Sequence, residues 1–464
     1  MSFFSSKFAV TLITSALLAI TPINAQIYNK TIQTTLGPVQ GYKYFTANVS
    51  EEYFDVSSSN VAAFLGIPYA ADTGYRNRWK PAQPRESWNE TLQATSFGPG
   101  CPTSSATGYV SEDCLSLNIW TNANSSSDKL PVLLWNQGSE ETMKNVVMVT
   151  FNRRDDVLGY LATPELNAEG LATTGYNTSG NYGVLDQLEV LKWIQNNIAN
   201  FGGDPDNVTI AGQSFGSSQV YHAINSPLFS GYFHRGISQS GIRYPYDTLL
   251  AGLATSYITM EKALSFGMNY TASQNVSTLA ELRELPLSDV IQGSNDRDSS
   301  IWYITALLCN DPLIFKPVLD GYVLPMKYLD QLIAGPANDV PLITENTKDE
   351  SGASTSLTLY NLTEYQEYNA LRWGNLSDTY FKLYPVDGNA TLANMAWNAA
   401  QRDVSLSAAS PIYTYYWDHA PPGQDQGAFH QSEIMYALNA LYANTDKYPF
   451  TDEDYYIGEL MTGY

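Results

Sequence analysis

The stretch DNVTIAGQSFGSSQVYHAI (206–224) constrains the fold more than any other part of the chain. It starts with a β-branched run, VTIA, and continues through GQSFG (212–216) into residues that suit a helix. Glycines on both sides of Ser214 allow a strand to turn sharply into a helix, which exposes the serine hydroxyl at the turn. The helix N-terminus then favours negative charge that develops beside that hydroxyl. The stretch therefore predicts a strand–turn–helix unit that carries a serine nucleophile.

A serine nucleophile on such a turn needs a histidine base and an orienting carboxylate, in the chain order Ser, Asp/Glu, His. The chain has only 4 histidines. His222 falls in the predicted helix after the serine, His234 precedes another strand, and His419 directly follows an aromatic strand. His430, in QGAFHQSEIMYAL, follows the last predicted strand and precedes an amphipathic helix. We therefore expect His430 to be the base.

The orienting carboxylate is expected after a strand that lies between Ser214 and His430 in the sequence. The segment VPLITENTKDESGAS (340–354) supplies a strand, followed by Asp349 and Glu350 in a turn-rich loop. Residue order alone leaves both carboxylates open. Either one can orient the histidine, and both can equally be solvated turn residues.

Length, composition and charge limit the classes of protein to which the chain can belong. A chain of 464 residues with 44% hydrophobic residues can bury a large core, and one large α/β domain fits this length as well as several smaller domains. A formal charge of −22, with no basic patch, disfavours nucleic acid and anionic membranes as partners. The histidines and cysteines lack metal-ligand spacing, and no glycine-rich phosphate loop occurs. We therefore expect neither a metal nor a cofactor.

The first residues, 1–25, resemble a secretory signal peptide. Lys7 precedes an apolar run from Phe8 to about Ile20, which is too short for a bilayer span, and Ala25 marks the expected cleavage site. No later segment is long and apolar enough to cross a membrane, so we expect a secreted protein. Sequons for N-glycosylation support this expected extracellular location. They occur at Asn29, Asn48, Asn89, Asn124, Asn177, Asn207, Asn269, Asn275, Asn361, Asn375 and Asn389.

Several separate motifs resemble those of the type-B carboxylesterases, the cholinesterase and fungal lipase relatives within the α/β-hydrolase fold. These motifs are FLGIPYA (64–70), NRWKPAQP (77–84), SEDCLSLNIW (111–120), the long stretch from GNYGVLDQ to AGQSFG (180–216), GISQSG (236–241), FKPVLDG (315–321) and GAFHQSEI (427–434). The resemblance implies one α/β-hydrolase domain over 26–464, with a central, mostly parallel, twisted sheet flanked by helices. It also implies a helical cap insertion from about Leu249 to Asp311.

What the resemblance implies for function is hydrolysis of small-molecule carboxylic esters without a cofactor. The family's nucleophile falls on Ser214, and the histidine of its GAxH motif falls on His430. The family's acid is the glutamate of an Asp-Glu-Gly motif, which selects Glu350 over Asp349. This chain has Asp-Glu-Ser at that position, so the loop glycine has moved to Gly352.

The resemblance also implies structural pairs. These are the ion pairs Arg78 with Glu112 and Arg154 with Asp186, and the disulfide Cys101 with Cys114. Cys309 is then left over, and because free cysteines are commonly buried, we expect a buried free thiol there. The loop closed by the disulfide is short and carries Tyr109 but no tryptophan. The resemblance therefore indicates a carboxylesterase for soluble esters, rather than an interfacial lipase or a choline esterase.

The main departure from the family lies after PVLLW (131–135). The family has Gly-Gly-Gly-Phe there and a longer segment before the next strand, whereas this chain has NQGSEE (136–141) and reaches Val146 almost at once. Backbone N–H groups of the glycine-rich loop and of the residue after the nucleophile stabilise the oxyanion. The expected donors here are Phe215 and Gly138. The family also continues beyond "YYIGELMTGY", so we expect the hydrolase domain to be C-terminally incomplete.

Two functions follow from this pattern. The first is a secreted serine carboxylesterase that works through Ser214, Glu350 and His430 and an acyl-enzyme. The second is a catalytically impaired or non-catalytic cholinesterase-like protein, because loss of even one oxyanion donor costs about 3 kcal/mol of transition-state binding.

Overall fold

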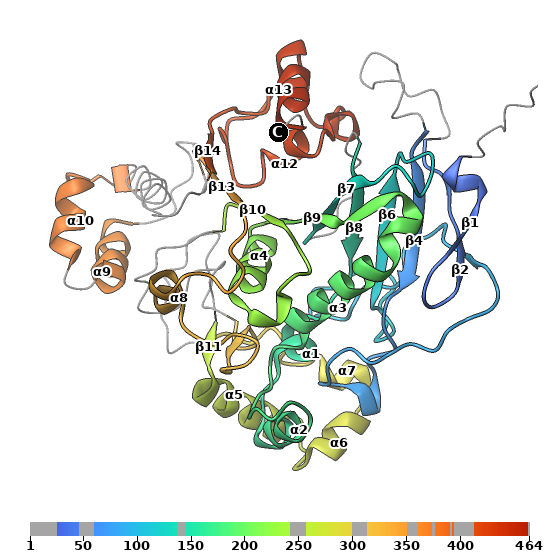
Figure 1. The fold of residues 1–464 in the computed structure, drawn as a ribbon. Helices are drawn as coiled ribbons and strands as arrows, with labels where there is room; N and C mark the ends of the chain where they lie inside the picture. Colours follow the sequence, from blue (N-terminus) through green and yellow to red (C-terminus); the bar gives the residue numbers. More distant parts are fainter. Residues whose placement is uncertain are drawn as a thin grey trace, which may run out of the picture.

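The computed structural model describes residues 26–45, 60–136, 145–241, 257–298, 313–349, 361–373, 376–389, 392–393 and 413–462. One large mixed sheet forms the centre of the fold (Figure 1). Its strands in spatial order are β14 (Tyr413–Trp417), β13 (Leu342–Thr347), β10 (Arg235–Gln239), β9 (Gly203–Gln213), β7 (Leu130–Trp135), β8 (Val147–Phe151), β6 (Ser116–Thr121), β4 (Ala62–Pro68) and β3 (Tyr42–Lys43). Smaller sheets contain β1 (Thr31–Gln33), β2 (Pro38–Gln40) and β5 (Leu92–Gln93), and β11 (Ile258–Thr259) with β12 (Val318–Leu319).

The large sheet is mostly parallel, as predicted. Every neighbouring pair from β14 across to β8 is parallel, whereas the pairs β8–β6, β6–β4 and β4–β3 are antiparallel. Every residue of β6 and β8 is buried, which is typical of a sheet covered on both faces. The carboxyl ends of the parallel strands therefore share one edge of the sheet, and Ser214 directly follows β9 at that edge.

Helices lie on several sides of the sheet (Figure 1). Their bounds are α1 (Asp156–Tyr160), α2 (Pro164–Thr174), α3 (Tyr182–Asn197), α4 (Phe215–Asn225), α5 (Met260–Ser273), α6 (Leu279–Glu284), α7 (Leu287–Val290), α8 (Tyr328–Ala334), α9 (Leu362–Trp373), α10 (Ser377–Leu383), α12 (Ile434–Ala437) and α13 (Asp452–Thr462). Helices α3 and α4 contact each other and β9. Helices α5, α6 and α7 are the described part of the expected cap insertion; its residues 249–256 and 299–311 lie outside the described ranges.

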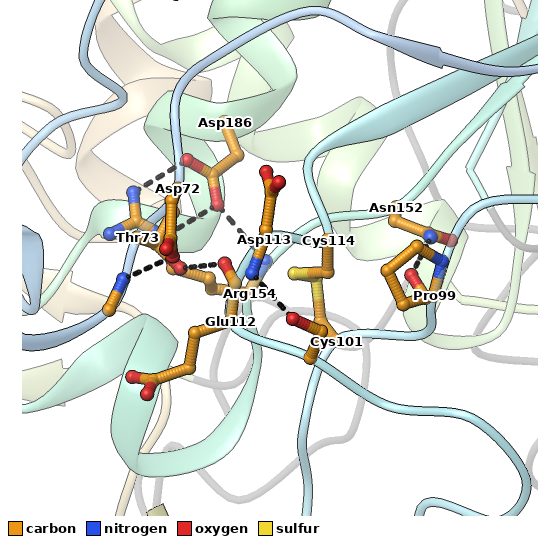
Figure 2. The surroundings of a disulfide bond; sticks show 12 residues. Asp72, Thr73, Pro99, Cys101, Glu112, Asp113, Cys114, Asn152, Arg154 and Asp186 are labelled. Atoms are coloured by element: carbon orange, nitrogen blue, oxygen red, sulfur yellow. Dashed lines mark hydrogen bonds and ion pairs between the residues drawn. A yellow bond between two sulfur atoms is a disulfide. The ribbon is translucent and has the colours of Figure 1, made fainter.

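Two buried ion pairs join segments that are distant in the sequence. Arg78 binds both carboxylate oxygens of Glu112, with Nε–Oε1 and Nη2–Oε2 distances of 2.6 and 2.7 Å. Arg154 binds Asp186 in the same way, with Nε–Oδ2 and Nη2–Oδ1 distances of 2.9 and 2.6 Å. Figure 2 shows Arg154 facing Asp186, which lies in α3. These four side chains are the ones for which the resemblance implied ion pairs.

A disulfide joins Cys101 to Cys114, whose Cα atoms are 5.0 Å apart. Within the loop that it closes, the Ser111 N–H donates to the Gly100 carbonyl, and the Tyr109 side chain is 78% exposed. The disulfide lies beside the segment that carries Glu112 and Asp113 (Figure 2). The third cysteine, at position 309, lies outside the described residues.

Replacing Cys101 and Cys114 together by alanine should lower the free energy of unfolding by about 3 kcal/mol. The bond links residues 13 apart, so its loss frees that loop in the unfolded chain. Urea unfolding followed by tryptophan fluorescence measures the difference, and wild-type protein reduced with dithiothreitol should behave like the double variant. Unchanged unfolding midpoints in both samples would contradict this account.

The C-terminal helix α13 is anchored through Asp454, which is 2% exposed. Its carboxylate accepts hydrogen bonds from His419 Nε2 at 2.8 Å, from the Tyr436 hydroxyl at 2.7 Å, and from the N–H and hydroxyl of Thr451 at 2.7 Å each. Burial alone would raise the pKa of Asp454. The hydrogen bonds, led by the one from His419, outweigh burial and lower that pKa to about 2.

This lowered pKa predicts an acid-sensitive C-terminal anchor. Because the folded-state pKa of Asp454 lies below its ordinary value of 3.8, the charged carboxylate stabilises the fold above about pH 4, and this contribution is lost as the pH falls toward 2. The thermal midpoint of the wild type should therefore exceed that of Asp454→Asn at about pH 5, and the gap should shrink toward pH 2. Calorimetry of both proteins across this range measures the gap. A gap that stays constant would contradict the assignment.

Candidate active site

Ser214 lies at the turn between β9 and α4. Its φ of 54° and ψ of −115° place the backbone in a conformation that residues other than glycine rarely adopt. The Ser214 N–H donates to the carbonyl of Gln239, at the end of β10, with an N–O distance of 2.9 Å. The predicted strand–turn–helix unit is therefore present, on a strand that is longer than the VTIA run alone.

The two glycines of the turn are required by close backbone contacts. A Cβ added at Gly212 would lie 2.5 Å from the carbonyl carbon of Gly216. A Cβ added at Gly216 would lie 2.0 Å from the carbonyl oxygen of Asn136, the residue that follows β7. The G-x-S-x-G spacing is thus explained by the tightness of the turn and by its contact with the neighbouring strand.

The N-terminus of helix α4 lies directly after Ser214. Phe215 is its first residue, and the first N–H groups of a helix have no acceptor within the helix. The Phe215 N–H and the positive end of the helix dipole therefore lie beside Ser214. The second expected donor, Gly138, lies outside the described residues. The chain leads toward it from Asn136, whose N–H donates to the Ala211 carbonyl at 2.8 Å.

The side chain of Gln213, the residue before Ser214, contacts His430. The Gln213 side-chain amide lies 3.0 Å from Nε2 and 3.3 Å from Nδ1 of the imidazole, and Gln213 is fully buried. An amide N–H can donate to the unprotonated nitrogen of a neutral imidazole, so this contact is compatible with a histidine that acts as a base. The half-buried Ser214 hydroxyl makes no hydrogen bond to another described residue. The helix expected after His430 is only the short α12.

The loop that carries His430 is tied to the end of β13 through Asp349. The Asp349 N–H donates to the Ala428 carbonyl, and the Ala428 N–H donates to Asp349 Oδ2, each at 3.0 Å. Asp349 also pairs with Phe429 in a parallel bridge. The residue before Glu350 is therefore adjacent to the residues before His430, while Glu350 itself lies outside the described residues.

Two buried carboxylates lie beside this site, on Glu345 of β13 and on Glu433, which are 3% and 0% exposed. The Ser240 hydroxyl donates to Glu345 Oε1 at 3.2 Å, and the Gln239 amide donates to the Tyr415 hydroxyl at 2.8 Å. Burial raises the pKa of Tyr415, and the charges of both glutamates raise it further. The Tyr415 hydroxyl therefore stays protonated at neutral pH and can act as a donor.

The other histidines lie away from the turn. His222 is buried in α4, and burial, with the charge of Arg153, lowers its pKa to about 4. The Val208 N–H donates to His234 Nδ1 at 3.1 Å, and His419 binds Asp454. No group of three or more metal-ligating side chains occurs within the described ranges. In the same part of the chain, no helix has the length and apolar character of a membrane span.

A groove of about 750 Å³ opens elsewhere, between α2 and α3. Its lining is mixed, with polar residues such as Lys80 and Glu169, aromatic residues such as Tyr182, and aliphatic residues such as Leu188. Neither Ser214 nor His430 lines it, so it is separate from the candidate site.

A serine on a strained strand–helix turn, with a histidine at the same edge of a parallel sheet, is the arrangement of an α/β-hydrolase nucleophile site. The carboxylesterase family model matches residues 28–403, so the chain belongs to the carboxylesterase family. The chain is thus a member of a family of carboxylic ester hydrolases, and both the predicted family and the predicted fold class are confirmed.

Known relatives agree with this membership. A fumonisin B1 esterase from Sphingopyxis macrogoltabida is 31% identical over 415 residues, which span 82% of this chain and 72% of that protein. The mouse carboxylesterase 1F is 33% identical over 330 residues, which span 64% of this chain and 56% of that protein. The structure of a thermophilic PNB esterase superposes with a TM-score of 0.71 at 24% identity, covering 93% of this chain and 89% of that one. This last likeness concerns the fold alone.

Sequence reasoning missed the contact between Gln213 and His430. The two residues are 217 positions apart, and only the pairing of parallel strands brings them together. The available signal was the position of Gln213, the last residue of the strand before the nucleophile, where a side chain must face either the core or the site.

Proposed function

We propose that this protein is a secreted serine carboxylesterase that acts through Ser214, His430 and Glu350 and a covalent acyl-enzyme. The single observation that carries the proposal is the strained turn that presents Ser214 at the end of β9, with His430 held against the preceding residue. A strained nucleophile that stays in place indicates that the surrounding structure is built for its exposure.

In the proposed mechanism, Ser214 Oγ attacks the ester carbonyl carbon while His430 Nε2 takes the hydroxyl proton. The carbonyl oxygen becomes an oxyanion beside the Phe215 N–H and the N-terminus of α4. The tetrahedral intermediate collapses, the C–O bond to the alcohol breaks, and the protonated His430 gives its proton to the leaving alcohol. Water then attacks the acyl group with His430 as base. The carboxylic acid leaves and Ser214 is regenerated.

Gln213 supports the role of His430. Its side-chain amide lies 3.0 Å from Nε2 of the imidazole, which keeps the ring close to the residue before Ser214. Catalytic hydrogen bonds are often long or unmade before substrate binds and form only in the complex.

Glu350 is the proposed orienting acid, on the strength of the family motif. The contacts of Asp349 support this choice, because the Asp349 carboxylate already accepts the Ala428 N–H and holds the histidine loop. A carboxylate with that task is poorly placed to turn toward the imidazole, and its neighbour remains for the role.

Gly138 is proposed as the second oxyanion donor. The carbonyl of Asn136 packs against Gly216 in the first turn of α4, so the chain that leads to Gly138 leaves the sheet next to Ser214. The family places its glycine-rich loop after the same strand.

An impaired or non-catalytic protein is the second candidate. The observation that favours it is in the sequence, where Ser139 and Glu140 stand in place of the family's glycines. A carboxylate in an oxyanion loop would disfavour the developing negative charge. The relatives are named as esterases, which favours the first candidate.

We also propose secretion and N-glycosylation. The predicted signal peptide, residues 1–25, lies outside the described ranges. The sequon asparagines within those ranges are all exposed except Asn207, which is half-buried, so glycans can be carried without disturbing the core. Small-molecule esters are the proposed substrates.

Hydrolysis of p-nitrophenyl acetate, butyrate and octanoate by the purified, glycosylated protein tests the proposed function. We expect saturable turnover that favours the shorter acyl chains. Absence of turnover in a sample that unfolds cooperatively on heating would reject the enzyme and support the impaired protein.

A further inference from the structure

The residue Arg153 lies in the segment after β8 and reaches the nucleophile turn. Its neighbour Arg154 binds Asp186 of α3, whereas Arg153 places its guanidinium carbon 4.7 Å from the ring centroid of Phe215. The Arg153 side chain is 9% exposed. A nearly buried cation therefore rests on the ring of the residue that immediately follows Ser214.

The ion pair of Arg153 is less complete than that of Arg154. Arg153 Nη2 lies 3.3 Å from Asp155 Oδ2, while Arg154 binds both oxygens of its partner at shorter distances. The buried Nε of Arg153 and Oδ1 of Asp155 have no hydrogen-bond partner among the described residues. Burying a charge is unfavourable unless other contacts compensate for the lost water. Asp155 and Tyr160 offset the cost of burying the Arg153 charge, and the Phe215 ring adds a further contact, since cation–π attraction strengthens when water is excluded.

Phe215 is held from three directions. On its N-terminal side, the Ser214 N–H is bonded to the Gln239 carbonyl. On its C-terminal side, Gly216 packs on the carbonyl of Asn136. Its side chain is held by Arg153. The first two contacts fix the flanking backbone, together with the Ser218 hydroxyl, which donates to the Phe215 carbonyl at 2.6 Å. Arg153 and the packing of the ring on the core restrain the Phe215 side chain.

We propose that Arg153 is a positioning residue that holds Phe215 so that its N–H points at the carbonyl oxygen under attack by Ser214. This inference rests on the proposed function, because it assigns a task to the oxyanion donor of that site. The positive guanidinium also adds to the field of the α4 N-terminus, which favours the oxyanion over the neutral ester. Both effects act in the transition state, so they change kcat and leave KM nearly unchanged.

The central experiment is a double-mutant cycle with Arg153→Met and Phe215→Leu, assayed with p-nitrophenyl butyrate. We expect Arg153→Met to lower kcat about tenfold with KM within about twofold. It should also weaken inhibition by a trifluoromethyl ketone, whose adduct with a serine carries the oxyanion, by a similar factor. Arg153→Lys should retain most of the activity because an ammonium can also lie over the ring. In the Phe215→Leu background, Arg153→Met should have little further effect.

A second variant with wild-type stability distinguishes a loss of activity caused by misplacing Phe215 from a loss caused by unfolding. Burial raises the pKa of Asp155 to about 6 against the opposing charge of Arg153, so removal of the arginine alone leaves a buried carboxyl without its cation. The double variant Arg153→Met/Asp155→Leu removes both charges, and such exchanges are often neutral for stability. It should melt near the wild-type temperature and still show the reduced kcat. The control Arg85→Met, at a partly exposed pair with Asp113, should leave kcat unchanged.

Each outcome either supports or overturns the positioning role of Arg153. Wild-type kcat in Arg153→Met, additive effects in the cycle, or recovery of kcat in the Arg153→Met/Asp155→Leu variant would overturn it while leaving the esterase intact. A wild-type protein that neither turns over esters nor reacts with a fluorophosphonate would instead reject the proposed function, and the inference with it.

Discussion

Replacement of Ser214 by alanine should lower kcat for p-nitrophenyl butyrate by about 10⁴- to 10⁶-fold. The alanine variant cannot form the acyl-enzyme, and only binding and oxyanion stabilisation remain to accelerate attack by water. Initial rates with saturating ester measure the loss, after correction for spontaneous hydrolysis. The variant should unfold near the wild-type temperature, because alanine keeps the serine Cβ and removes a half-buried hydroxyl that has no hydrogen bond to another described residue.

The matched control is Ser217→Ala. Ser217 lies in the same helix, and its hydroxyl is bonded to the Ser238 hydroxyl. This variant should retain most of the activity. Equal losses in the two variants would indicate damage to α4 rather than loss of a nucleophile. A Ser214→Ala protein with more than about a tenth of the wild-type rate would exclude the acyl-enzyme mechanism.

Replacement of Arg154 by methionine should lower the free energy of unfolding by about 3–5 kcal/mol. Asp186 is fully buried, and Arg154 supplies two side-chain hydrogen bonds to it, at 2.9 and 2.6 Å. Without Arg154 the carboxylate loses its charge partner in a site that water cannot reach. Urea unfolding at neutral pH measures the difference.

The control for this prediction is Arg85→Met. Arg85 and Asp113 form an ion pair at 2.6 Å whose side chains are 27% and 42% exposed. Water screens such a pair, so the change should be less than about 1 kcal/mol. Similar losses in the Arg154 and Arg85 variants would show that burial does not set the strength of these pairs.

The architecture around the nucleophile could be predicted from local chemistry. A β-branched run followed by glycines around Ser214 and then a helix-compatible stretch has few structural solutions, and the structure has the expected one. The wider family and fold were predicted from resemblance and are confirmed. The motifs of the family are spread along the chain. The family can therefore be identified despite a single mismatch, such as the missing glycines after Trp135.

The ion pairs and the disulfide depended on the resemblance. Nothing in the spacing of Arg78 and Glu112, which are 34 positions apart, indicates that they meet. The rule that opposite charges three or four residues apart attract applies within one helix, so it cannot predict ion pairs between distant segments. Only a known fold can assign such partners before a structure is available.

The side chains that surround the nucleophile were the least predictable part. Gln213 reaches His430, and Arg153 reaches Phe215, through the packing of separate segments at the carboxyl edge of the sheet. In sequence, Arg153 is merely the first of two consecutive arginines. Its different surroundings from Arg154 follow from the alternation of side chains along an extended backbone, which assigns opposite sides but not partners.

The central claim is that Ser214 is the nucleophile of an ester hydrolase, and reaction with a fluorophosphonate tests it most directly. The purified protein is incubated with the reagent, digested, and mapped by mass spectrometry beside the Ser214→Ala variant. We expect a single phosphonylated site at Ser214 in the wild type and no label in the variant. Absence of label on folded wild-type protein, or label at another residue, would contradict the account.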